Sequence, residues 1–281
     1  MNTIHHLITV RGPMSHGSFE KDLGNAMLFR RSPVMAPDGR LYRIPVLSAG
    51  ALRGVVRRIL WREVFAKTGL SRETMGEVAW DRLYAALCNG GTIEASESRV
   101  SPDTIRARRA AMPVLSLLGS ALYTSHMAGL ARVTNSWLVC KESRAAGLVS
   151  VLAPGCDLPA CDLLAEESRV RHVDQEEQNP DVSNVGPMPT TIEVVIAGAR
   201  LAGTMTSSGE LEASAWAHGL EQVSHLGGKS AAGFGEVEIA HDGDPSLYRA
   251  WLEQAVADGT LRTSLLALAE ELTPSKKAKK K

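Results

Sequence analysis

The sequence lacks the features that mark membrane proteins and secreted disulfide-rich proteins. No apolar run approaches the roughly 20 residues that span a bilayer, and residues 1–10 lack the charged and apolar zones of a signal peptide. Four cysteines in 281 residues are too few for a disulfide framework, so we interpret them as reduced thiols. We therefore expect a cytoplasmic protein with no membrane partner.

Motifs of familiar enzyme classes are also missing. The sequence shows no H-E-x-x-H motif, no paired catalytic carboxylates and no Ser/His/Asp signature. Cys156, Cys161 and His172 could supply three zinc ligands, but the C-x4-C spacing lacks a fourth partner at a standard distance. His5 and His6 occupy a predicted strand, where a structural histidine is more typical than a ligand. We expect no catalytic residue, metal site or cofactor.

Aromatic residues make up only 5% of the chain, and no set of them is arranged for base stacking. Charge is unevenly distributed, although the net charge is zero. Lys plus Arg outnumber Asp plus Glu by 17 to 10 in residues 1–113 and by 5 to 0 in residues 276–281, whereas acids dominate by 12 to 4 in residues 191–275. This asymmetry suits a protein that holds a polyanion on one face, with a solvated mixed surface as the alternative.

The first of two glycine-bearing segments, residues 44–58, reads IPVLSAGALRGVVRR. Ser48 is a predicted N-cap, and the first turn of the predicted helix contains no acid. Backbone amides at this helix N-terminus can bind an anion, and basic side chains lie just before and after them. The predicted contacts are Arg30, Arg31, Ser48, Gly50, Arg53, Arg57 and Arg58. A basic, solvated helix face is the alternative.

The second glycine-bearing segment, residues 226–235, reads LGGKSAAGFG. It is not a P-loop, because Val223 stands where that motif requires glycine and a strand rather than a helix follows. Its small residues allow close approach of a backbone or a phosphate, with Lys229 as a point charge. The predicted contacts are Gly227, Gly228, Lys229 and Ser230, and we expect Lys229 and Arg53 to face solvent. A tight structural turn is the alternative.

Apolar, β-branched runs predict strands at residues 4–10, 137–140, 148–152, 190–197, 201–206 and 234–240. Helical apolar spacing predicts helices at residues 48–66, 77–87, 103–111, 114–127, 210–224 and 246–272. Residues 68–135 look like an inserted helical lobe rather than part of the core. Without insertions, the order is the β-α-β-β-α-β pattern of the ferredoxin-like fold, which the RNA-recognition motif shares. We predict an α+β fold.

The two segments together resemble a known signature. Residues 30–34 (RRSPV), 38–39 and 44–54 resemble the basic-rich and I-P-G-S-S-L-K-G elements of the repeat-associated mysterious protein superfamily, and residues 227–235 resemble its C-terminal glycine-rich loop. Within that superfamily the chain is similar to backbone subunits of CRISPR effector complexes. The run at residues 24–31 is most similar to the type IV backbone protein.

This resemblance implies a hand-shaped RNA-binding protein. A modified ferredoxin-like or RNA-recognition-motif palm would cover residues 1–67, 136–156 and 190–245, with a helical finger insertion at 68–135. A β-hairpin thumb at 157–189 would kink the guide RNA, with Arg169, Arg171 and Met188 as contacts. Residues 246–281 would form a C-terminal helix and a disordered basic tail. The implied partners are crRNA, further copies in a helical filament, other effector subunits and target nucleic acid paired to the guide.

One residue bears on catalysis. Type III backbone subunits cut target RNA with an aspartate in the loop after the first strand, and Asn25 occupies the corresponding position and would contact RNA instead. A neutral amide can neither serve as a carboxylate ligand nor act as a base. We therefore expect a subunit without nuclease activity. The alternative is a metal-dependent nuclease that uses Asp22, three residues away.

Overall fold

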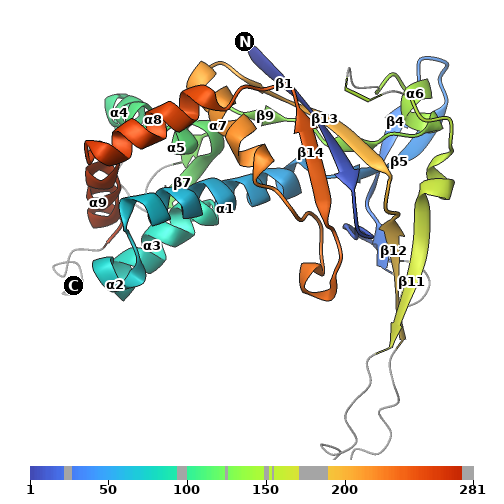
Figure 1. The fold of residues 1–281 in the computed structure, drawn as a ribbon, viewed down its shortest axis with the longest axis horizontal. Helices are drawn as coiled ribbons and strands as arrows, with labels where there is room; N and C mark the ends of the chain where they lie inside the picture. Colours follow the sequence, from blue (N-terminus) through green and yellow to red (C-terminus); the bar gives the residue numbers. More distant parts are fainter. Residues whose placement is uncertain are drawn as a thin grey trace, which may run out of the picture.

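The computed structural model describes residues 1–21, 27–93, 100–123, 126–148, 152–153, 155–170 and 189–273. The described residues form a mixed α+β fold with largely antiparallel sheets, which confirms the predicted class (Figure 1). Most helices gather at one end of the long axis, and the two larger sheets lie toward the other end (Figure 1). No helix among the described residues has both the length and the apolar character to cross a membrane.

The largest sheet contains both ends of the predicted palm. Its strands, in spatial order, are β14 (Val237–His241), β1 (Asn2–Val10), β13 (Arg200–Ser207), β10 (Ser136–Leu138), β5 (Leu41–Leu47) and β4 (Arg31–Met35), with β9 (Arg132–Val133) paired to β13. Every neighbouring pair is antiparallel. The register places Ile4 opposite Met205 and Ile8 opposite Leu201, so apolar side chains of the two central strands share one face.

A second sheet has the order β11 (Leu164–Val170), β12 (Pro189–Val195), β3 (Met27–Phe29) and β2 (Gly17–Lys21). Strands β11 and β12 are antiparallel, with Val170 opposite Pro189, and they extend away from the body in Figure 1. They flank residues 171–188 of the predicted thumb, which lie outside the described residues. A third, small sheet contains β6 (Gly91–Ile93), β7 (Gly119–Tyr123) and β8 (His126–Ala128).

The helices are α1 (Ala49–Thr68), α2 (Arg72–Met75), α3 (Glu77–Cys88), α4 (Pro102–Ala111), α5 (Pro113–Leu118), α6 (Lys141–Ala145), α7 (Glu210–Glu221), α8 (Ser246–Ala257) and α9 (Thr260–Leu272). The longest, α1, begins after Ser48 as predicted and ends at Gly69, which has a positive φ of 66°. The predicted C-terminal helix is divided into α8 and α9, because Gly259 adopts a φ of 73° between them.

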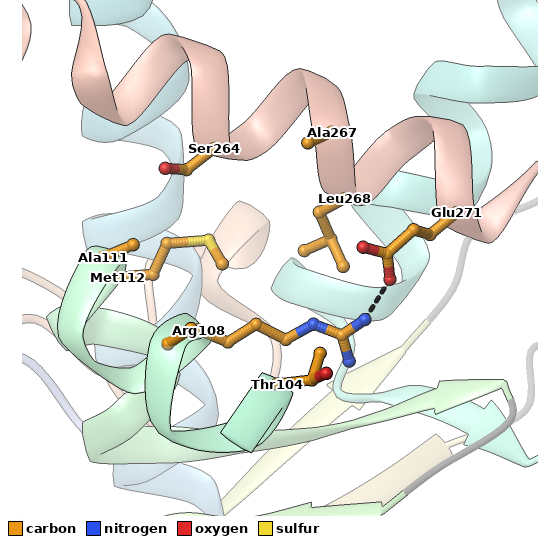
Figure 2. A pocket seen from close by; sticks show the side chains of 9 residues that line it. Thr104, Arg108, Ala111, Met112, Ser264, Ala267, Leu268 and Glu271 are labelled. Atoms are coloured by element: carbon orange, nitrogen blue, oxygen red, sulfur yellow. Dashed lines mark hydrogen bonds and ion pairs between the residues drawn. The ribbon is translucent and has the colours of Figure 1, made fainter. Parts of the chain in front are cut away.

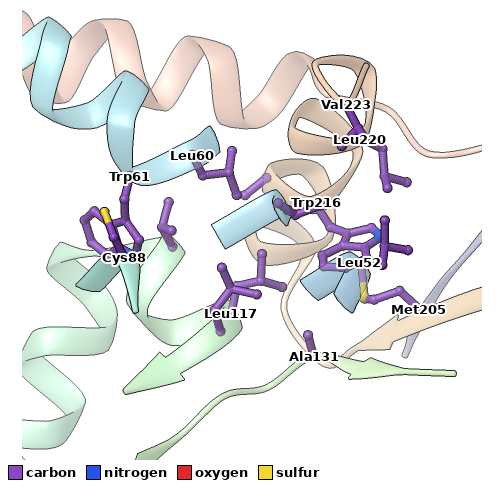
Figure 3. Packing of buried hydrophobic residues seen from close by; sticks show 14 of the residues in the cluster. Leu52, Leu60, Trp61, Cys88, Leu117, Ala131, Met205, Trp216, Leu220 and Val223 are labelled. Carbon is purple, nitrogen blue, oxygen red and sulfur yellow. The ribbon is translucent and has the colours of Figure 1, made fainter. Parts of the chain in front are cut away.

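The main hydrophobic core lies between the large sheet and the helices (Figure 3). Trp61 on α1 and Trp216 on α7 are fully buried within it. Leu117 on α5 and Cys88 at the end of α3 belong to the same core. The expectation that residues 68–135 lie outside the core is therefore wrong, because the apolar faces of α3 and α5 pack against α1 and α7.

The helix predicted at residues 114–127 is also wrong beyond Leu118. Gly119 takes a φ of 65°, and a Cβ there would lie 2.3 Å from the Met127 carbonyl oxygen. The chain turns at this glycine and continues as β7, which pairs with β6 and β8. Apolar residues alone do not distinguish a buried strand from a helix over so short a run.

Candidate nucleic-acid interface

The N-terminus of α1 is partly occupied by the protein itself. Ser48 is extended at φ −65° and ψ 142°, and its Oγ accepts a hydrogen bond from the Ala51 amide at 3.3 Å. The Ala49 amide donates to Asn135 Oδ1 at 3.0 Å. The Gly50 amide has no partner within the described parts of the chain, and the space where its Cβ would stand is open. One first-turn amide therefore remains open to an external anion.

The short segment after β1 joins the two glycine-bearing segments. His16 Nε2 accepts a hydrogen bond from the Ser48 amide at 3.2 Å. On the other side, the Gly228 amide donates to the Ser15 carbonyl at 2.8 Å, and Ser15 Oγ donates to the Gly228 carbonyl at 3.1 Å. Two adjacent residues, Ser15 and His16, thus hold together Ser48 and Gly228, which lie far apart in the sequence.

The protonation state of His16 is set by its surroundings. Burial, with the Arg30 guanidinium nearby, lowers the pKa of His16 below its ordinary value. The imidazole is therefore neutral at pH 7, so its Nε2 can accept from the Ser48 amide. Sequence analysis missed Ser15, His16 and Asn135 because none of them belongs to a glycine-bearing segment.

Glycine is required at two positions of the second segment. Gly227 has a φ of 88°, and a Cβ there would lie 2.2 Å from the Ser15 carbonyl oxygen. Gly235 has a φ of 79°, and its Cβ would lie 2.0 Å from the Leu226 carbonyl oxygen. At both positions the group that approaches closely is the chain's own backbone. The predicted contacts of Gly227, Gly228 and Ser230 with RNA stay predictions.

Lys229 is strained and exposed. Its φ of 61° makes it the one non-glycine residue with a positive φ among the described residues. A lysine in this conformation costs about 1 kcal/mol relative to glycine. The exposure of its side chain agrees with the sequence prediction. Lys229 lies in a glycine-rich turn, directly before the short 3-10 turn Ser230–Ala232.

Arg53 and Arg57 turn toward the end of α5. Arg57 Nη1 donates to the Gly119 carbonyl at 2.6 Å, and its Nη2 donates to the Leu118 carbonyl at 2.9 Å. Arg53 also donates to the Leu118 carbonyl. A helix C-terminus concentrates partial negative charge, so both guanidiniums stabilise α5. The expectation that Arg53 faces solvent is therefore wrong, because its side chain is half-buried.

These two arginines form a cationic cavity. They line a hollow of about 370 Å³ together with His126 and Gly129. Burial lowers the pKa of Arg53, and burial together with the Arg53 charge lowers the pKa of Arg57 to about 10. Neither has a carboxylate partner among the described residues. Two cations repel each other here, and an anion in the cavity would relieve that repulsion.

The remaining predicted arginines differ in environment. Arg58 is exposed on α1. Arg31 forms an ion pair with Glu193 on β12, and both side chains are largely buried. Its charge is therefore partly neutralised within the protein. Arg30 lies close enough to His16 to influence its pKa.

Most residues predicted for the thumb contacts, and the two residues that bear on nuclease activity, lie outside the described residues. Asn25, Asp22, Arg171 and Met188 lie there, and of Arg169 only the backbone, in β11, is described. Their roles stay predictions.

The other candidates for chemistry form no metal cluster within the described ranges. His5 pairs with Asp242 at 2.7 Å on the surface. His6 is buried, and its Nε2 lies 2.8 Å from Ser136 Oγ. Both histidines therefore have partners within the protein, as expected for structural histidines rather than metal ligands. His172 lies outside the described residues.

A further hollow, of about 210 Å³, lies between α4 and α9 (Figure 2). Arg108 reaches from α4 to form an ion pair with Glu271 on α9, while Met112 and Leu268 give the hollow an apolar wall. It holds no nucleophile with an adjacent base.

The chain matches no protein-family profile and no curated protein sequence. A chain of a type IV-B CRISPR complex is similar in structure, with a TM-score of 0.58 and 21% sequence identity, over 86% of this chain and 90% of that chain. A chain of type III-B Cmr-beta bound to cognate target RNA gives a TM-score of 0.47 at 12% identity over 86% and 97% of the two chains. Csc2 of Thermofilum pendens gives 0.40 at 12% identity over 95% and 80%. The first likeness shows that this chain has the fold of a chain in a CRISPR complex.

Proposed function

We propose that this chain is a non-catalytic backbone subunit of a cytoplasmic CRISPR ribonucleoprotein, most similar to the type IV backbone protein. It would bind guide RNA and assemble along it with further copies, other effector subunits and the paired target. The main support is that Ser15 and His16 hold together the two glycine-bearing segments for which the sequence predicts anion binding. The shared fold with a chain of a type IV-B CRISPR complex points the same way.

The strand order supports a ferredoxin-like palm. Taking β1, α1, β10, β13, α7 and β14 as the β-α-β-β-α-β units, the spatial order of the strands is fourth, first, third, second, all antiparallel. In this arrangement α1 and α7 pack on the same face of the sheet. The remaining strands and helices would then be additions to the palm.

We propose that the RNA is held through its phosphates. On the face of the central strands opposite the helices, the side chains include Leu7 and Ala202, which are buried by Val139 and Ala153. An RNA-recognition motif instead presents aromatic residues there for base stacking. Among the described residues, the groups available to RNA are the Gly50 amide, Arg58, Lys229 and the cavity of Arg53 and Arg57. All of these suit a polyanion rather than particular bases.

Salt dependence of binding tests this proposal. We expect wild-type protein to bind unrelated single-stranded RNAs with similar affinity, and the affinity to fall steeply with salt. Lys229→Gly removes the charge and relieves the positive φ. It should therefore keep full stability, weaken RNA binding roughly 3- to 10-fold and reduce the slope of log K against log salt by about 0.7.

Lys67→Ala is the matched control, since Lys67 lies at the opposite end of α1 from Ser48 and pairs with Glu63. Salt-insensitive, sequence-selective binding would refute a phosphate-based interface. For catalysis, the assembled complex with magnesium or manganese should leave a matched, labelled RNA intact. Periodic cuts that disappear in Asp22→Ala would instead establish a nuclease.

A further inference from the structure

An exposed apolar face lies on the β4–β5 hairpin. Met35 and Leu41 are directly opposite each other in its register, and they are 67% and 64% exposed. The other face of the hairpin packs on the protein, where Val34 and Tyr42 are partly buried against the core. The two exposed side chains are therefore not needed to fold the hairpin.

An apolar groove lies between α2, α3 and α9. It has a volume of about 500 Å³ and is lined by Met75, Ala79, Leu266 and Ala269, with Glu270 at its edge. Leu266 is 37% exposed. The groove is large enough to receive two apolar side chains, and exposed apolar surfaces of this kind typically mark interaction sites.

The charges around these two surfaces are complementary. Glu270 at the groove and Glu73 on α2 have no cationic partner among the described residues. At the hairpin, Arg40 is 76% exposed, with only an exposed pair to Asp38 at 3.5 Å. Arg72 beside the groove is already engaged by Glu77 and Asp81, so Glu270 and Glu73 are the charges there that can attract the exposed Arg40 of the hairpin.

The two surfaces lie at opposite ends of the molecule's long axis (Figure 1). A single copy cannot bring them together. When one surface of a protein fits a different surface of the next copy, the contact is head-to-tail and repeats along a chain of copies. A self-complementary dimer would instead require each surface to meet itself.

We propose that the β4–β5 hairpin of one copy inserts Met35 and Leu41 into the α2–α3–α9 groove of the next copy. Arg40 then lies close to Glu270 across the contact. This interface rests on the proposed function, because it specifies how copies would meet along the RNA. It assigns to the hairpin and the groove a role that is separate from RNA contact.

The test counts copies per RNA by mass photometry, with affinity for the first copy measured separately. For Met35→Asp and for Leu266→Asp, the first copy should bind RNA with an affinity within twofold of wild type. Binding of the next copy beside it should weaken at least tenfold. Leu247→Asp, an exposed leucine on α8 away from both surfaces, is the control and should assemble normally.

Mixing the two variants distinguishes a head-to-tail contact from misfolding. Each variant retains one intact surface, so the mixture should form pairs but no longer assemblies. Arg40→Glu should weaken assembly, and adding Glu270→Arg in the same chain should restore it. Normal assembly by Met35→Asp or Leu266→Asp, or no pairs in the mixture, would overturn the interface. If wild-type protein binds no RNA, the proposed function fails, and the same variants then test the interface on free protein by sedimentation at high concentration.

Discussion

Arg57 and Arg58 are adjacent in sequence, yet the structure predicts opposite consequences of their loss. Arg57 donates hydrogen bonds to the Leu118 and Gly119 carbonyls, whereas Arg58 is exposed. Hydrogen bonds from a charged donor contribute about 1.5–3 kcal/mol. Arg57→Ala removes the donor to the buried Gly119 carbonyl, whereas the Leu118 carbonyl still accepts from Arg53. Relief of repulsion with Arg53 offsets part of this loss. We therefore expect Arg57→Ala to lower the free energy of unfolding by about 2 kcal/mol.

In a chain of this size, that change lowers the melting temperature by about 4–8 °C. Arg58→Ala should leave the melting temperature within about 1 °C. It should weaken RNA binding, because it removes one of the solvated cations that we propose to contact RNA phosphates. Thermal denaturation of both variants measures the effect on stability, and filter binding measures the effect on RNA affinity. Equal melting temperatures for Arg57→Ala and wild type would refute the role assigned to Arg57 at the end of α5.

Two further predictions concern the stability of the folded chain. Gly227→Ala should lower the free energy of unfolding by at least about 2 kcal/mol in urea denaturation, because its Cβ would lie 2.2 Å from the Ser15 carbonyl oxygen. Gly233→Ala is the control and should cost less, because the space around its Cβ position is open. Equal losses of stability in the two variants would contradict this prediction. Burial lowers the pKa of His6 from 6.5 to about 4, so between these values the unfolded chain binds a proton that the folded chain does not. Stability should therefore fall by up to about 3 kcal/mol as the pH falls from 6.5 to 4, and His6→Asn should lose this component of the pH dependence.

Local signals in the sequence were sufficient for the elements with strong periodicity. Helix α1 begins after its predicted cap, Ser48, and strands β1, β12 and β13 lie close to their predicted positions. The β4–β5 hairpin was missed. Its residues were interpreted as part of a basic motif, and Pro33 and Pro45 within the two strands obscured the strand pattern.

The candidate site depends on contacts that no local pattern contains. Ser48 and Gly228 are held together through Ser15 and His16, a connection that only the folded sheets create. From the sequence alone, Arg53, Arg57 and Arg58 form one basic group with the same predicted role in RNA contact. Helical geometry separates them, because Arg53 and Arg57 are four residues apart and face α5, while Arg58 points elsewhere.

This separation limits how strongly one copy can hold RNA. Arg53 and Arg57 already donate to carbonyls of the protein, and Arg31 is paired with Glu193. Within the described part of the chain, Arg58 and Lys229 are exposed cations near the site, in a chain of zero net charge. A few phosphate contacts give weak binding at physiological salt. Stable assembly along a guide RNA would then require contacts between copies, so disruption of the proposed hairpin–groove interface should reduce filament length far more than it reduces binding of a first copy.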